Sequence, residues 1–187
     1  MANDINELNS ELRARFPGET LVFGDGNVHA RLILIGEAPG EKEALEGRPF
    51  VGKAGKNLDE FLLLSGLKRS DLYITNAVKL RPTKPGKSGR NVNRAPTASE
   101  IEAFRPFLLR EIELISPRFV ATLGNVPLCA LTGQKLSIGD CHAQMINLGA
   151  YTLYPMYHPA SVIYNRALKK VYEADVTKLG ELMLKHA

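Results

Sequence analysis

The sequence predicts a three-layer α/β/α sandwich around a central, mainly parallel sheet of four strands. Short apolar runs alternate along the chain with longer segments whose apolar residues recur at helical spacing, as expected for strand–crossover–strand units. In the predicted strand 31–35, residues 32–35 are all apolar rather than alternating, which is typical of a strand covered on both faces. With 187 residues, no internal repeat and no linker, the chain is expected to form a single domain, residues 1–187.

The first half of the chain supplies two of the four strands. A capped helix is expected from residue 4 to residue 16, where Pro17-Gly18 ends it. A turn at 24–27 precedes the first strand, 31–35. A helix with an apolar face ends at Gly66, and the second strand follows at 71–76.

The second half repeats this alternation. Thr97 and Glu100 form a capping box that opens a long helix, which continues to residue 115. A strand at 118–124 and a short helix come next, and a small hairpin is expected around Gly139. The fourth strand, 151–157, leads into the last helix.

Composition restricts the class of protein. No apolar stretch approaches the roughly 20 residues that span a bilayer, and the first residues lack a secretory signal pattern. Cys129 and Cys141 are the two cysteines, and neither belongs to a CxxC pair, so a disulfide framework or zinc site is not indicated. We therefore expect a cytoplasmic protein without a membrane partner.

A glycine-rich loop, residues 36–55, follows the first strand and is predicted to be the floor of a site. Ligands of open α/β sheets bind at the carboxyl ends of the strands, where Glu37, Asn76 and His158 all lie. If these strands are neighbours, the three side chains converge. Within the loop, Phe50 is either a core aromatic or a stacking surface for a flat ligand.

Two of the converging residues also have alternative interpretations. Asn76 is either a turn cap or a carboxamide that reads the edge of a base. His158 is either structural or a donor to developing negative charge. The segment 47–53 has the spacing of a phosphate-binding loop, but Ala54 stands where a magnesium-binding hydroxyl is needed and Pro49 lacks an N–H, so we reject a nucleotide triphosphatase.

The net charge of +4 is concentrated in one block, residues 79–94, which carries six basic residues and no acidic one. Such a block either contacts phosphates or is a solvated loop.

Four ordered motifs carry a family resemblance. GEAPGE at 36–41, GRPFVGKAG at 47–55, ITNAVKLRP at 74–82 and YHPASVI at 157–163 resemble the uracil-DNA glycosylase superfamily, particularly its family 4. The likeness covers nearly the whole chain, and the superfamily fold is an α/β/α sandwich with a four-stranded parallel sheet. It implies excision of a flipped-out uracil from DNA in base-excision repair, by hydrolysis of the N-glycosidic bond. On this resemblance we expect a monomer that is associated with the nucleoid of a bacterium or archaeon.

The resemblance also implies roles for individual residues. Glu37 would place water or stabilise the cationic sugar, and His158 would donate to a uracil carbonyl. Phe50 would stack on the base, and Asn76 would read its Watson–Crick edge. The remaining base-binding positions are in the loop: Gly36, Ala38, Pro39 and Gly40. DNA contacts are expected from Lys53, Lys56, Lys79, Arg81, Lys84, Lys87, Arg90, Ser161, Val162 and Arg166.

The sequence departs from the family pattern at two places. Family 4 enzymes usually hold a [4Fe–4S] cluster on four cysteines, but here Leu80 and Phe104 replace two of them, so we expect no metal or other cofactor. Ala44 stands where an Asp is common, which leaves open a second substrate class, hypoxanthine, xanthine or another deaminated base in DNA. A nucleic-acid-binding module without catalysis is the remaining alternative.

Overall fold

The computed structural model describes residues 3–186 and contains a six-stranded sheet in the order β1–β3–β2–β6–β8–β7. The four inner strands are parallel, as predicted. Each outer strand is two residues long and antiparallel to its neighbour. The strands of this sheet are β1 (Asp25–Gly26), β2 (Leu32–Gly36), β3 (Tyr73–Asn76), β6 (Phe119–Leu123), β7 (Ile146–Asn147) and β8 (Thr152–Met156).

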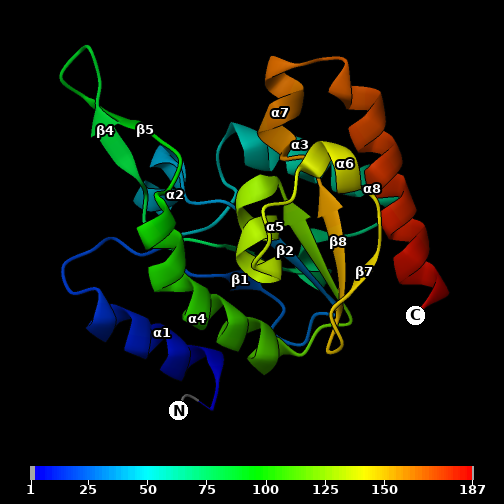
Figure 1. Cartoon of the computed structure of the whole chain (residues 1–187), viewed down its shortest axis with the longest axis horizontal. Helices are drawn as coiled ribbons and strands as arrows, with labels where there is room; N and C mark the ends of the chain where they lie inside the picture. Colours follow the sequence, from blue (N-terminus) through cyan, green and yellow to red (C-terminus); the bar gives the residue numbers. More distant parts are fainter. Residues whose placement is uncertain (1–2, 187) are drawn as a thin grey trace.

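Helices cover both faces of the sheet, which explains the continuous burial of its inner strands (Figure 1). One layer contains α1 (Ile5–Arg15), α4 (Ala98–Ile115) and α5 (Asn125–Thr132). The opposite layer contains α3 (Lys53–Ser65), α7 (Pro159–Tyr164) and α8 (Leu168–Lys185).

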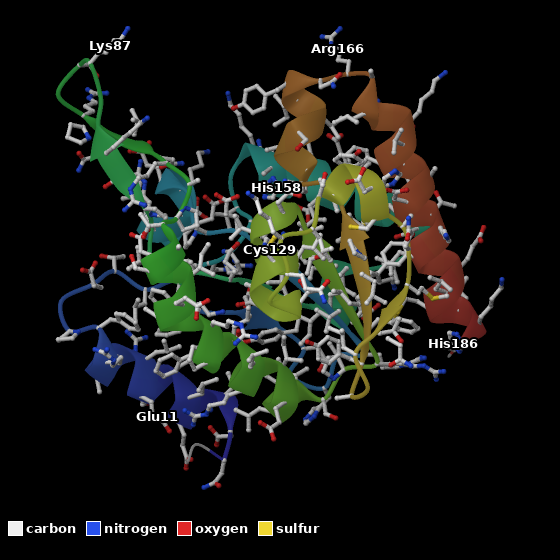
Figure 2. All side chains as sticks on the ribbon, in the orientation of Figure 1. Glu11, Lys87, Cys129, His158, Arg166 and His186 are labelled. Carbon is white, nitrogen blue, oxygen red and sulfur yellow. The ribbon has the colours of Figure 1, made fainter. Side chains whose placement is uncertain are left out.

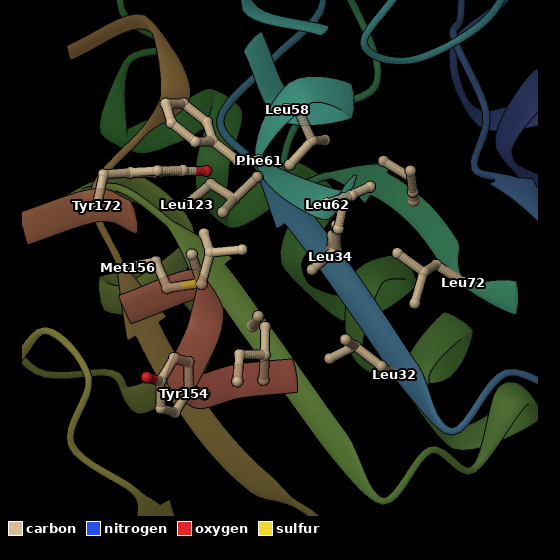
Figure 3. Close-up of a cluster of buried hydrophobic side chains, with 14 of the residues drawn as sticks. Leu32, Leu34, Leu58, Phe61, Leu62, Leu72, Leu123, Tyr154, Met156 and Tyr172 are labelled. Atoms are coloured by element: carbon tan, nitrogen blue, oxygen red, sulfur yellow. The ribbon is translucent and has the colours of Figure 1, made fainter. Parts of the chain in front are cut away.

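Successive residues of β2 pack into different layers. Leu32 and Leu34 belong to the apolar cluster that includes Phe61 of α3 and Tyr172 of α8, shown in Figure 3. Ile33 and Ile35 pack with residues of α4 and α5 instead. The period of two in a strand therefore places alternate side chains into two cores, and the sheet is held rigidly between them.

The remaining elements lie outside the three layers. They are α2 (Glu41–Glu46), η1 (Arg69–Asp71), α6 (Ile138–Cys141) and a hairpin formed by β4 (Thr83–Pro85) and β5 (Asn91–Asn93). The hairpin, which we call the arm (residues 83–93), extends away from the body of the molecule in Figure 1. Within residues 3–186, no helix combines the length and apolar character needed to cross a membrane.

The predicted hairpin around Gly139 is wrong. Gly139 lies in α6, and the chain instead reverses between β7 and β8, where Gly149 has a φ of +85°. The predicted turn at 24–27 contains β1, which pairs with β3.

Candidate active site

The glycine loop begins where β2 ends, and Gly36 allows two functional side chains to meet there. A Cβ atom on Gly36 would lie 2.5 Å from Oδ1 of Asn76 and 2.5 Å from Cζ of Phe50. Both distances are far shorter than a van der Waals contact. The phenyl ring and the carboxamide therefore approach the backbone of β2 so closely that only glycine fits.

Phe50, Asn76 and His158 line one cavity of about 530 Å³. Glu37 lines an adjoining cavity of about 210 Å³. The two cavities share His158 and three further residues, Ala38, Gly40 and Asn93. The structure thus brings together the four groups that the sequence places after strand ends and in the glycine loop, although β6 separates β2 from β8.

Phe50 belongs to the apolar core and also lines the cavity, so the core interpretation is confirmed and stacking on a flat ligand stays a prediction. Its surface is 6% exposed, and its ring centroid is 5.8 Å from that of His158, with 30° between the planes. Phe50 has a φ of +55°, which is uncommon for a bulky residue. Arg69 holds this conformation by donating to the carbonyl of Phe50 at 3.1 Å and to that of Pro49 at 2.6 Å.

His158 is the N-cap of α7, and this local role fixes its tautomer. Its Nδ1 accepts a hydrogen bond from the Ala160 N–H at 3.1 Å. Nδ1 is therefore the acceptor, which leaves the proton of the neutral ring on Nε2. Burial lowers the pKa of His158 to about 4, against a small opposing effect of Glu43. At neutral pH the imidazole is uncharged and has one N–H to donate.

Glu43 organises the loop, a role that the sequence reasoning missed. Its carboxylate accepts from the backbone N–H groups of Gly40 at 3.1 Å, Val51 at 3.0 Å and Gly52 at 2.7 Å. These bonds join the two ends of the segment that presents Phe50. The signal in the sequence is the capping position: Glu43 is the third residue of α2, whose N-cap is Gly40.

Glu37 is the first residue after β2 and is partly buried. Burial raises the pKa of its carboxyl group above the ordinary value of 4.5. Its backbone carbonyl accepts from the Val78 N–H at 3.0 Å, which fixes the chain beside β3. Glu37 lines the smaller cavity together with His158.

The arm contributes a polar side chain to the walls of both cavities. Asn93, at the end of the arm, lines both cavities, and its Oδ1 accepts from Arg81 at 2.7 Å. Figure 2 shows Lys87 at the tip of the arm and Arg166 beyond α7, with His158 lying deeper in the molecule. Lys53 and Lys42 are exposed and line the larger cavity, and the sequence reasoning missed Lys42. The other predicted DNA-contacting basic residues that are exposed are Lys56, Lys84, Lys87, Arg90 and Arg166.

Two predicted DNA-contacting residues are buried, and those predictions are wrong. Lys79 is 1% exposed and forms an ion pair with Glu111 at 2.6 Å, so its ammonium group cannot reach a phosphate. Val162 is 8% exposed because it faces the core from α7. Its neighbours Ile163 and Tyr164 are the exposed residues, at 44% and 88%. Ser161 is partly buried.

The residues present do not fit an iron–sulfur cluster. Leu80 and Phe104 pack in an apolar cluster with Val78 and Phe16, whose ring stacks on Phe104 at 4.3 Å. Both cysteines lie elsewhere, in α5 and α6. In residues 3–186, no group of three or more His, Cys, Asp or Glu side chains could hold a metal ion.

Ala44 is not among the residues that line the cavity of Phe50, Asn76 and His158. It lines a separate cavity with Leu80 and Arg81. The argument that Ala44 widens the range of bases therefore loses its structural support.

In this α/β/α sandwich, an aromatic ring, a carboxamide, a neutral imidazole and a carboxyl group surround the cavities at the carboxyl edge of the sheet. The fold and this lining together define a class of α/β protein whose site has the chemistry to bind a flat, polar heterocycle. The family model "Uracil DNA glycosylase superfamily" matches residues 23–178, and the chain belongs to this family.

Relatives with curated descriptions agree. The chain is 40% identical over 171 residues to the type-4 uracil-DNA glycosylase of Saccharolobus solfataricus, covering 87% of this chain and 76% of the relative. It is 38% identical over 169 residues to the type-4 uracil-DNA glycosylase of Thermotoga maritima, covering 88% and 84%. The crystal structure of Pedobacter heparinus SMUG2 has the same fold, with a TM-score of 0.60 at 14% identity, covering 85% of this chain and 77% of that one.

Proposed function

We propose that the protein is a monofunctional uracil-DNA glycosylase of base-excision repair. The observation that carries this proposal is the single cavity lined by Phe50, Asn76 and His158. A target base inside a duplex is out of reach, so the nucleotide must be extruded into this cavity, at a cost of a few kcal/mol.

Asn76 and Phe50 select and hold the base. Phe50 stacks on the heterocycle, and Asn76 pairs with the carbonyl and N–H of uracil. Cytosine presents an amino group and a bare nitrogen at the same places, so each mismatched buried group costs about 1–3 kcal/mol. Gly36, which has no side chain, leaves room for both groups beside the end of β2.

His158 and Glu37 assist the two halves of the reaction. The bond between C1′ and the base breaks with its electrons on the base, and the Nε2–H of His158 donates to the carbonyl oxygen on which negative charge develops. The loop from Gly36 through Ala38 and Pro39 to Gly40 contributes backbone dipoles. Glu37 stabilises the cationic sugar and orients the water whose oxygen bonds to C1′. The water proton passes to Glu37 or to solvent.

DNA is held by the exposed basic residues of the arm and of the rim. Contacts to phosphates position the duplex without reading its sequence. We assign this role to Lys53, Lys56, Lys84, Lys87, Arg90 and Arg166, with Ser161 beside them; Arg81 contributes by holding Asn93. We further propose that the protein works as a monomer in the cytoplasm. We also propose that it works without an iron–sulfur cluster, since Leu80 and Phe104 stand where two of the cluster's cysteines would be and pack in an apolar cluster.

The test is release of free uracil from a labelled oligonucleotide with one uracil. His158→Ala, Asn76→Ala and Glu37→Ala are each expected to reduce the rate by about 10²-fold or more, whereas Lys135→Ala, at an exposed position on another face, leaves it unchanged. Parent-like rates in all three variants would show that the site is wrong. Binding of DNA without release of a base would support the non-catalytic nucleic-acid-binding module instead. We expect full activity in protein that contains no iron.

A further inference from the structure

A buried ion pair lies directly behind the base-reading residue. The side chains of Lys79 and Glu111 are 1% and 3% exposed, and their charged atoms are 2.6 Å apart. Lys79 follows β3, and Glu111 is on α4. The pair therefore joins the end of β3 to the helical layer beneath it.

All three N–H bonds of the Lys79 ammonium group have an acceptor. They reach Oγ1 of Thr75 at 2.5 Å, the backbone carbonyl of Asn76 at 2.8 Å and Oε2 of Glu111 at 2.6 Å. Since an ammonium group has three donors and no acceptor, its hydrogen bonding is complete. Two of its three partners are consecutive residues of β3.

Glu111 binds the same strand through two hydroxyl groups. Its carboxylate accepts from the hydroxyl of Tyr73 at 2.9 Å and from that of Thr75 at 3.2 Å. The pairing of β3 with β1 ends at Ile74, so the carbonyl of Asn76 lies beyond that ladder. Lys79 donates the hydrogen bond to the Asn76 carbonyl that a longer β1 strand would otherwise supply.

Stability alone does not account for this pair. Burying two charges carries a desolvation penalty that their attraction often fails to exceed, and apolar residues of similar volume frequently stabilise a core as well or better. Unlike apolar packing, the hydrogen bond from Lys79 to the Asn76 carbonyl is directional. It fixes the peptide plane from which the side chain of Asn76 extends toward the cavity.

We propose that the Lys79–Glu111 pair is a positioning device for Asn76: it sets the orientation of the carboxamide that reads the base. This inference rests on the proposed uracil excision. Neither residue touches the substrate; both act through the backbone of Asn76.

The experiment replaces the pair by Lys79→Met/Glu111→Leu, which removes both charges together and leaves no unpaired charge in the core. The control, Glu11→Gln/Arg110→Gln, removes a 2.6 Å ion pair that also involves α4 but joins it to α1. We expect the double variant to stay folded and to lose about 10²-fold in kcat/KM for uracil release, as expected for a misplaced group. The control should keep the parent value.

A double-mutant cycle separates positioning from a general structural effect. In an Asn76→Ala background, the Lys79→Met/Glu111→Leu change is expected to cause no further loss, because the residue through which it acts is gone. Parent-like excision by the double variant, or an undiminished further loss in that background, would overturn the proposal.

An NMR measurement keeps the test independent of activity. The side-chain amide signal of Asn76, assigned by its absence from Asn76→Ala, should shift in the pair variant and not in the control. If the Lys79→Met/Glu111→Leu protein fails to fold, Lys79→Met/Glu111→Gln replaces it in both measurements with the same expected directions, because it also removes both charges and keeps an acceptor for the hydroxyls of Tyr73 and Thr75. An unmoved signal would contradict the positioning role, whereas a parent protein that releases no uracil would contradict only the proposed function.

Discussion

Gly36→Ala tests the close approach on which the site is built. The added Cβ would lie 2.5 Å from both Phe50 Cζ and Asn76 Oδ1. Ordinary contact begins at 3.4 Å, so each atom must retreat by about 0.9 Å. Overpacking of this kind costs about 1–3 kcal/mol of folding free energy, and a catalytic group misplaced by about 1 Å can cost about 10²-fold in rate.

We therefore expect Gly36→Ala to fold, with a lowered melting temperature, and to release uracil about 10²-fold more slowly than the parent in single-turnover assays. Gly139→Ala is the matched control, because a Cβ there meets only ordinary contacts, at 3.6 Å from Ser137 and 3.7 Å from Tyr157, and neither residue lines the two cavities. A folded Gly36→Ala protein with the parent rate would refute the reasoning, since Phe50 and Asn76 would then not need their observed positions.

Three further predictions follow from the site. Glu43→Ala removes the acceptor for three backbone N–H groups, so limited proteolysis should cut the loop 40–52 faster than in the parent. Uracil release should slow by about tenfold or more, as expected when one catalytic group is misplaced. An unchanged rate of proteolysis would show that the loop does not need Glu43. Replacing Lys84, Lys87 and Arg90 of the arm by Ala removes three cations, so a filter-binding titration of duplex DNA should show a slope of log K against log salt that is smaller by about 2–3. An unchanged slope would remove the arm from the DNA interface. The pKa of Glu37 is raised above 4.5 and its ionised form is the active one, so the rate should fall as the pH drops through that raised value. The pH profile of Glu37→Gln should lack this fall in rate at acid pH. If the fall persists in Glu37→Gln, another group causes it.

The core strands were predictable because their signal is local. The run ending at Ile35 is apolar at each position that must be covered on two faces, and the structure buries all of β2. The carboxyl ends of parallel strands share one edge, so Glu37, Asn76 and His158 could be placed together from the sequence alone. Gly36 and Phe50 were likewise visible from the loop that contains them.

The errors arose where a distant partner decides the outcome. Lys79 looks like any other cation of a basic block, and only the fold brings Glu111, 32 residues away, against it. Val162 lies between exposed and partly buried neighbours in a short helix whose inward face depends on α3 and α8. Glu43 is one of several acids in the glycine loop, and its three hydrogen bonds appear only when the loop closes.

The most direct measurement is a base-release panel on otherwise identical oligonucleotides. With uracil, hypoxanthine, xanthine, thymine or cytosine at one position, chromatography of the released base should show free uracil and no thymine or cytosine. Release of a deaminated purine in preference to uracil, or release of no base at all, would contradict a slot shaped for one pyrimidine.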